Sequence, residues 1–268
     1  MSEDEVWRTA RMRERFTFDA VAKTYDAARP GYPLALFEDV ADFAGLTGGD
    51  RILEVGCGSG QATLGFAPMG LPMLALDPGA ELLALARRNL SPFGHVAFAE
   101  TTFEAWPPEP GAFRLVVSAQ AIHWVAPEIR FAKAAAALSP GGTLAVFGNV
   151  PMTVPDDVRA AIHGAYLAVA PELLGLAAPE TWYLGSGPLA GLIAETPAFA
   201  AVEHRAYGWS MPQTAASYRA LMATKSYHQV LPQARREALF EAIERAVAAV
   251  SDGFDLGYET HLYLAKAG

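Results

Sequence analysis

The feature that most constrains this chain is the stretch R-I-L-E-V-G-C-G-S-G-Q-A-T, residues 51–63. It begins as an apolar run that contains the acidic residue Glu54, and it then places glycines at positions 56, 58 and 60. Glycine adopts backbone conformations closed to other residues and lets a ligand approach the main chain closely. A helical pattern follows, and the start of a helix presents N–H groups to a ligand. The stretch therefore predicts a strand, a tight ligand-binding loop and a helix.

The spacing of the glycines separates two classes of ligand. A dinucleotide-binding fingerprint has the form G-x-G-x-x-G/A, whose third small residue lies where the helix meets the strand. Counted from Gly56 this position holds Gln61, and counted from Gly58 it holds Thr63. The observed E-x-G-x-G-x-G instead resembles motif I of the class I S-adenosylmethionine-dependent methyltransferases. Taken alone, the loop is also compatible with an ordinary turn between strand and helix.

A second acidic residue follows at the distance typical of nucleotide-binding folds. The apolar run 71–76 ends at Asp77, and Pro78 and a helical stretch over residues 80–90 come next. In nucleotide-binding α/β folds, an acidic residue about 20 residues after the loop binds the ribose hydroxyls. The structural alternative is that Asp77 only caps the following helix. The glycine loop upstream favours ribose binding.

Composition narrows the possible partners. The 268 residues include 20 basic and 29 acidic side chains, and the resulting net charge of −9 argues against nucleic acid, which needs a basic face. Cys57 is the only cysteine, so no intramolecular disulfide can form and a reducing compartment fits. The acidic N-terminus lacks the apolar segment of a signal peptide, and prolines and glycines interrupt the longest uncharged run, residues 134–155. We expect a cytoplasmic monomer or homodimer with no membrane partner.

The order of the expected elements predicts an α/β fold. Residues up to about Arg29 have helical spacing, and a sharp turn at 139–142 leads into the fifth strand. The expected strands are 51–55, 72–76, 95–99, 114–118, 143–147, 201–208 and 255–265. The expected helices are 33–44, 61–66, 81–90, 128–138, 214–223 and 233–250. Alternating elements imply a mostly parallel, Rossmann-like sheet of seven strands with helices on both faces and ligands at the carboxyl ends of the strands.

The segment after the fifth expected strand departs from this alternation. It is mostly helical, with prolines that break it up. We expect residues 151–199 to form a helical lid that shapes the substrate site. Residues 1–150 then form a cofactor-binding core with an N-terminal helical cover, and residues 200–268 complete the sheet.

Several motifs together resemble one family. They are F-D-A-V-A-K-T-Y-D-A-A-R-P-G-Y-P at 18–33, the E-V-G-C-G-S-G loop, Asp77, and A-Q-A-I-H-W at 119–124. This set is similar to the small-molecule class I methyltransferases of type 11, which include the trans-aconitate methyltransferases. The resemblance covers residues 15–150 firmly and residues 201–267 more loosely. It implies S-adenosylmethionine as cofactor and methyl transfer to a small acceptor, first of all to a carboxylate or hydroxyl oxygen.

The resemblance also implies which residues hold the cofactor. The glycine loop would line the methionine and ribose, Asp77 would hold the ribose, and the backbone of Thr102 and Phe103 would reach adenine. Ala119 and Gln120 would lie beside the methionine. Arg29 would meet the methionine carboxylate or form a surface ion pair. The complete expected set is Tyr25, Arg29, Glu54, Gly56, Cys57, Gly58, Gly60, Gln61, Asp77, Pro78, Thr102, Phe103, Ala119 and Gln120.

His123 and Trp124 are the first candidates for the acceptor side, because they follow the fourth expected strand. Histidine can act as a general base toward a hydroxyl or an amine, and Trp124 offers an apolar face with one N–H donor. The alternative is that His123 only bonds to backbone and Trp124 only packs. A carboxylate acceptor is ionised already and needs no base. Tyr227 and His228, between two expected helices, are further candidates for substrate contact.

Other chemistries are less well supported. Cys57 occupies a loop position that faces a cofactor, which argues against a nucleophilic role. The six histidines show none of the spacings of a metal site. Two rival functions remain, a nicotinamide-dependent oxidoreductase on a similar fold and a non-catalytic S-adenosylmethionine-binding protein.

Overall fold

The computed structural model describes residues 28–175 and 179–268. The chain divides into two compact units. The larger unit comprises residues 31–150, 180–207 and 260–268, and the smaller one includes residues 151–179 and 208–259. The helix expected up to Arg29 falls almost entirely on residues 1–27, outside the described part of the chain.

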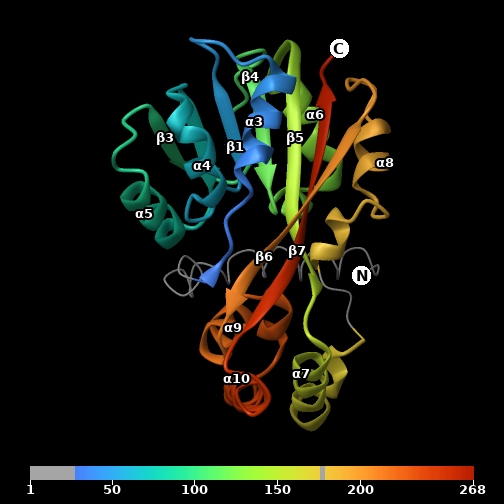
Figure 1. Ribbon diagram of the computed structural model, residues 1–268. Helices are drawn as coiled ribbons and strands as arrows, with labels where there is room; N and C mark the ends of the chain where they lie inside the picture. The colour runs from blue at the N-terminus through green and yellow to red at the C-terminus, as the bar shows by residue number, and fades with distance from the viewer. Residues whose placement is uncertain (1–27, 176–178) are drawn as a thin grey trace. The chain divides into compact units, whose positions relative to one another are not determined.

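Seven strands form one sheet in the order β3-β2-β1-β4-β5-β7-β6 (Figure 1). Neighbours are parallel in the pairs β1–β2, β2–β3, β1–β4 and β4–β5, which confirms the expected α/β class. The chain order reverses direction between β1 and β4, and ligands of open α/β sheets bind where such a reversal occurs. The strands are β1 Ile52–Val55, β2 Met73–Asp77, β3 Val96–Glu100, β4 Phe113–Ala119, β5 Leu138–Thr153, β6 Glu203–Gln213 and β7 Phe254–Lys266.

The helices for which the sequence predicted bounds begin and end close to the expected positions, and α7 and α8 lie in the segment expected to be mostly helical. Those of the larger unit are α3 Leu34–Ala44, α4 Gln61–Phe66, α5 Ala80–Asn89, α6 Pro127–Ala137 and α8 Leu189–Ala194. Those of the smaller unit are α7 Asp156–Val169, α9 Ala215–Ala223 and α10 Gln233–Ala248. Short 3-10 turns used below are η3 Ile122–Trp124, η5 Pro179–Tyr183 and η6 Ser226–Val230.

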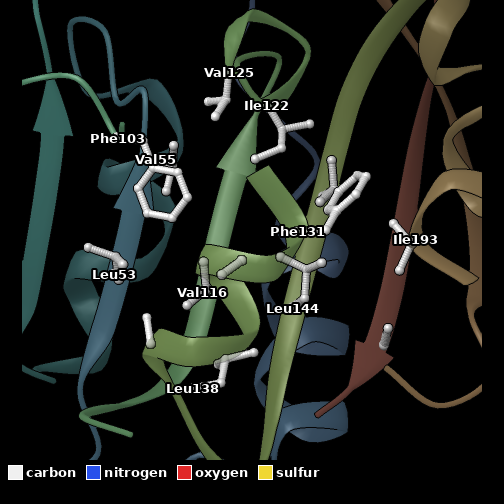
Figure 2. Close-up of a cluster of buried hydrophobic side chains, with 14 of the residues drawn as sticks. Leu53, Val55, Phe103, Val116, Ile122, Val125, Phe131, Leu138, Leu144 and Ile193 are labelled. Carbon is white, nitrogen blue, oxygen red and sulfur yellow. The ribbon is translucent and has the colours of Figure 1, made fainter. Parts of the chain in front are cut away.

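Two hydrophobic cores cover the two faces of the central strands, because successive side chains of a strand point to opposite faces. On one face, Leu115 and Val117 of β4 pack with residues of α3 and α4. On the other face, Val116 of β4 packs with Phe131 of α6 and Ile193 of α8 (Figure 2). Helices on both faces bury the sheet and leave the carboxyl ends of the strands for a site.

The structure differs from expectation at the start of β5. Residues 139–142 were expected to form a sharp turn, but β5 already begins at Leu138 and runs through them. The register against β4 jumps between the pairs Phe113–Leu138 and Leu115–Thr143, so the extra residues form an irregularity within the strand. Hydrogen bonds to the residue directly after β7 compensate, since Gly141 N–H donates to the Ala267 carbonyl at 3.2 Å and Ala267 N–H to the Gly142 carbonyl at 2.8 Å. Tertiary pairing thus overrides the local turn preference of Pro140 and Gly141.

The smaller unit has a helical core of its own. Side chains of α7, α9 and α10 form it, among them Tyr166, Tyr218 and Phe240. The segment after β5 is shared between the units, because residues 151–179 belong to the smaller one and residues from 180 on to the larger one. The division into core, lid and C-terminal part stays a prediction. None of the helices in the described ranges combines the length and apolar character needed to cross a membrane.

Candidate cofactor and acceptor site

The loop after β1 has a backbone that requires glycine at alternate positions. Gly56, Gly58 and Gly60 have φ angles of 73°, 56° and 94°, in the left-handed region. Space is short as well, because a Cβ on Gly56 would lie 2.3 Å from the Cβ of Ala121 and one on Gly60 would lie 2.8 Å from Leu90 Cδ1. The loop therefore forms a cradle in which the main chain itself is the surface offered to a ligand.

Asp77, at the end of β2, binds this loop directly. Its Oδ2 accepts a hydrogen bond from Gly58 N–H at 2.9 Å, and its Oδ1 accepts one from Gly79 N–H at 2.8 Å. Gly79 directly precedes α5, so this second bond fixes the turn that leads into the helix. An ionised carboxylate accepts up to about four hydrogen bonds, so these two bonds are compatible with additional bonds from ribose hydroxyls.

Glu54 lies fully buried beneath the same loop. Its Oε2 accepts a hydrogen bond from Thr63 Oγ1 at 2.7 Å, while its Oε1 is buried with no hydrogen-bond partner among the described residues. Burial raises the pKa of Glu54 to about 7, the Thr63 bond opposes this, and the charge of Asp77 adds to the increase. A buried acceptor of this kind needs either a proton or a donor. Together with the glycine cradle, this orphaned oxygen fits a ligand that brings a donor to the loop.

The remaining loop residues support the cradle. Gln61 begins α4 and its Nε2 donates to Ser59 Oγ at 2.8 Å, while Pro78 is half-buried beside Asp77. Burial, followed by the negative charges of Asp77 and Glu54, raises the pKa of the Cys57 thiol well above its usual value. A protonated thiol is a poor nucleophile, which agrees with the non-catalytic interpretation of this cysteine.

The end of β4 has a strained backbone. Ala119 is its last residue, and Gln120 has a φ of 51°, the one positive value of a non-glycine residue within 28–175 and 179–268. Such strain concentrates at functional sites. Hydrogen bonds hold the Gln120 side chain, since Tyr32 Oη donates to Oε1 and Nε2 donates to the Asn149 carbonyl, both at 3.3 Å.

Thr102 and Phe103 form the turn after β3. Thr102 Oγ1 accepts from Ala105 N–H at 3.1 Å, and the buried Phe103 ring stacks on Trp106 with 6.0 Å between centroids. Lys133 of α6 fixes this turn by donating to the carbonyls of Glu104 at 2.9 Å and Trp106 at 2.6 Å. The Phe103 side chain faces the core, and the backbone contact of Thr102 and Phe103 to adenine stays a prediction.

His123 lies at the centre of an aromatic cluster, which we define as His123, Trp124, Trp182 and Tyr183. The Nδ1 of buried His123 lies 2.9 Å from Tyr183 Oη. Its ring centroid is 4.7 Å from that of Trp124 and 5.9 Å from that of Trp182. The guanidinium of buried Arg130 lies over the Trp182 ring at 5.2 Å. The sequence analysis missed Arg130, on the following helix, and also Trp182 and Tyr183, since no local pattern links residues about 60 positions apart.

Other predicted site residues lie elsewhere. Tyr25 is outside the described residues, and Arg29 Nη2 donates to the Thr224 carbonyl at 3.0 Å. Tyr227 and His228 belong to η6 in the smaller unit. His228 is fully buried, and both of its ring nitrogens form hydrogen bonds within that unit. Nε2 lies 2.7 Å from Tyr166 Oη, and Nδ1 lies 2.7 Å from the Met222 carbonyl oxygen. Their role in substrate contact stays a prediction.

A metal centre finds no support where side chains are described. Across the described ranges, no group of three or more His, Cys, Asp or Glu side chains is arranged to hold an ion.

Comparisons with known proteins agree with this geometry. A family model described as a methyltransferase domain matches residues 52–142. An uncharacterized methyltransferase of Mycobacterium tuberculosis, Rv3342, is 26% identical over 91% of this chain and 93% of its own. A ubiquinone biosynthesis O-methyltransferase of Methylocella silvestris is 32% identical, but only over 44% of this chain and 47% of its own.

Solved structures show the same fold. A protein from Anaeromyxobacter dehalogenans, provisionally named a type II methyltransferase, superposes with a TM-score of 0.63 over 89% of this chain and 97% of its own, at 21% identity. The phosphoethanolamine N-methyltransferase 2 of Haemonchus contortus, solved with S-adenosyl-L-methionine, gives a TM-score of 0.55 over 94% of this chain and 60% of its own, at 16% identity. The architecture is that of a Rossmann-like methyltransferase. The match over residues 52–142, the relatives and the shared fold together support a class I S-adenosylmethionine-dependent methyltransferase.

Proposed function

We propose that the protein transfers the methyl group of S-adenosylmethionine to an oxygen of a small acceptor. The observation that carries this proposal is the glycine cradle, in which Gly56 lies against Ala121 and the N–H of Gly58 is bonded by Asp77. The similarity to an O-methyltransferase over 44% of the chain supports oxygen as the accepting atom. The sequence motifs resemble those of the trans-aconitate methyltransferases. The proposed acceptor oxygen therefore belongs to a carboxylate or to a hydroxyl.

Each part of the site has a separate task in this proposal. The cradle and Gln120 bind the methionine portion, Asp77 holds the ribose hydroxyls, and the backbone at Thr102 and Phe103 meets adenine. Bound S-adenosylmethionine would supply an electrophilic methyl group on a sulfonium. The aromatic cluster then positions the acceptor and excludes water, which accelerates displacement by alignment and desolvation. His123 would accept a proton where the acceptor is protic.

The first test is a titration followed by a transfer assay. Calorimetry should show binding of S-adenosylmethionine and weak or no binding of NAD. The protein is then incubated with methyl-labelled S-adenosylmethionine and a pooled small-metabolite fraction, and transferred label is counted before and after mild alkali. Alkali-labile label indicates a methyl ester, and stable label indicates an ether, amine or carbon product. Binding without any transfer would favour the rival, non-catalytic function.

A substitution in the aromatic cluster separates the acceptor site from the cofactor site. Trp124→Ala should reduce methyl transfer more than it reduces S-adenosylmethionine affinity, because the Trp124 side chain packs against His123 in the aromatic cluster. Equal loss of both would remove Trp124 from the acceptor site.

Location and assembly complete the proposal. We infer a cytoplasmic enzyme, since the single cysteine is buried as a thiol, which fits a reducing compartment. A monomer or a homodimer is expected, and light scattering on the purified chain tests this directly.

A further inference from the structure

We propose that Asn149 is a positioning residue for the cofactor, which fixes Gln120 at the end of β4 and joins it to the chain segment that begins at Gly31. This inference rests on the proposed function, in which Gln120 binds the methionine portion of S-adenosylmethionine. It assigns a role to a residue of β5 that the sequence analysis did not predict as part of the site. The residues of this arrangement all belong to the larger unit.

Gln120 needs support from its neighbours, because its backbone has a φ of 51°. This left-handed conformation is unfavourable for a residue with a side chain, so it persists only where surrounding groups hold it. Strand β5 supplies these groups. Gln120 N–H donates to the Phe147 carbonyl at 2.9 Å, and Gln120 Nε2 donates to the Asn149 carbonyl at 3.3 Å. The main chain and the side chain of Gln120 are therefore both bonded to one strand.

The Asn149 side chain extends this arrangement to two other parts of the chain. It is buried, its Nδ2 donates to the Gly31 carbonyl at 2.9 Å, and its Oδ1 accepts from Thr260 Oγ1 at 2.6 Å. Gly31 lies in the segment before α3, and Thr260 belongs to β7. A single buried amide thus joins β5 to the last strand and to a segment 118 positions earlier in the chain.

Backbone carbonyls determine the direction of these bonds. A carbonyl can only accept, so the atom of Asn149 that faces Gly31 is its NH₂ group, and its oxygen accepts from the Thr260 hydroxyl. The same reasoning applies to Gln120, whose NH₂ group faces the Asn149 carbonyl. Its Oε1 then accepts from Tyr32 Oη at 3.3 Å. The network therefore assigns nitrogen and oxygen in both amides.

Asn149 acts on both ends of the Gln120 amide. Its carbonyl accepts from Gln120 Nε2, while its side chain holds Gly31, the residue before Tyr32. The Tyr32 hydroxyl in turn donates to Gln120 Oε1. The Tyr32 ring also packs edge to face on Phe147, with 4.9 Å between centroids. Loss of the Asn149 amide should therefore release Gln120 from a conformation that it does not adopt readily by itself.

The first test compares two buried amides that are each replaced by a carboxyl. Asn149→Asp keeps the bond from Thr260 but places two acceptors face to face at Gly31. Gln213→Glu is the matched control, because Gln213 is also buried, accepts from Ser217 Oγ at 2.8 Å and lies in the smaller unit. Calorimetry should show S-adenosylmethionine affinity reduced on the order of tenfold in Asn149→Asp and native affinity in Gln213→Glu. Native affinity in Asn149→Asp would overturn the proposal.

The loss in Asn149→Asp should depend on pH. Burial raises the pKa of the introduced carboxyl, and its protonated form can donate to the Gly31 carbonyl as the amide does. The ratio of native to variant affinity should therefore decrease from about pH 8 to about pH 5.5. This ratio cancels pH effects common to both proteins, including the titration of Glu54. A ratio that stays constant would contradict a role for the Gly31 bond, since a generally weakened fold does not recover on acidification.

A double-mutant cycle tests whether Asn149 acts through Gln120. The cycle uses Asn149→Ala, which introduces no charge, and Gln120→Gly, which removes the amide and adopts the left-handed backbone without strain. Asn149→Ala should lower cofactor affinity on the order of tenfold in the native chain and less than about threefold in the Gln120→Gly background. Equal losses in the two backgrounds would overturn the positioning role.

Failure of the proposed function would give a different result, because the native protein itself would then not bind S-adenosylmethionine. The positioning role is still tested in that case by urea unfolding of the proteins of the same cycle. Asn149→Ala should lower the unfolding midpoint by less in the Gln120→Gly background than in the native chain. An equal decrease in both would show that Asn149 does not hold Gln120.

Discussion

Gly56 in the loop after β1 and Ala121 after β4 approach so closely that a Cβ on Gly56 would lie 2.3 Å from the Ala121 Cβ. The contact joins two strand ends that are neighbours in the sheet. Ala121, which lies outside the glycine loop, therefore forms one side of the cradle.

Gly56→Ala should destabilise the protein for two separable reasons. Its φ of 73° costs a non-glycine residue about 1–2 kcal/mol, and the clash with Ala121 adds on the order of 1–3 kcal/mol. Gly49→Ala is the matched control, because Gly49 has a φ of 95° but nothing within 4 Å of an added Cβ. Urea unfolding of both variants should show the larger loss for Gly56→Ala, and equal losses would mean that the Ala121 contact is unimportant.

Asp77→Ala should weaken S-adenosylmethionine binding by about 2–4 kcal/mol, through loss of ribose bonds and of the bond to Gly58 N–H. Titration calorimetry measures this. Asp50→Ala removes a comparable contact, since Asp50 Oδ2 accepts from Thr47 N–H at 2.7 Å in an exposed turn, and it should bind normally. Unchanged affinity in Asp77→Ala would remove Asp77 from the cofactor site.

Glu54 should make stability fall as pH rises. Its pKa in the folded protein is about 7 against a usual 4.5, so between these values the folded state retains a proton that the unfolded state has lost. Stability is therefore full below about pH 4.5 and decreases toward pH 7, by roughly 3 kcal/mol at most. Glu54→Gln should flatten this part of the pH–stability curve from urea unfolding. A native curve that already rises with pH over this range, with the same slope in Glu54→Gln, would contradict the assignment.

Lys133→Met should loosen the turn that carries Thr102 and Phe103. The lost bonds to the carbonyls of Glu104 and Trp106 are worth about 1–2 kcal/mol of stability after allowance for partial exposure. Cofactor affinity should fall with it, because in the proposed function this turn positions its backbone for adenine. Lys266→Met removes a lysine whose ammonium lies over the Phe43 ring, and it should keep native affinity. Equal affinities of the two variants would separate the turn from cofactor binding.

The sequence was most informative where a local rule determines the structure. Alternate glycines, an acidic residue at the next strand end and alternating apolar runs predicted β1, β2 and the cradle, because positive φ and strand burial are encoded within a few residues. Pro140 and Gly141 were misleading for the same reason, because their turn preference is local, whereas the bonds of Gly141 and Gly142 to Ala267 are not.

Only part of the candidate acceptor site could be predicted from the sequence. His123 and Trp124 belong to a sequence motif. Trp182 and Tyr183, which contact His123, come from a segment with no regular sequence pattern. Gly148, on a third element, leaves room for the Tyr183 ring. Contacts of this separation depend on how the chain folds back and leave no signature in one sequence.

Burial of the only cysteine, Cys57, within the cradle gives the protein an internal reporter. With its pKa raised and only 5% of its surface exposed, the thiol resists alkylation while the loop is closed. The rate at which a thiol reagent modifies Cys57 therefore reports how often this loop opens. A ligand bound in the cradle would lower this modification rate. Binding could therefore be measured without knowledge of the acceptor.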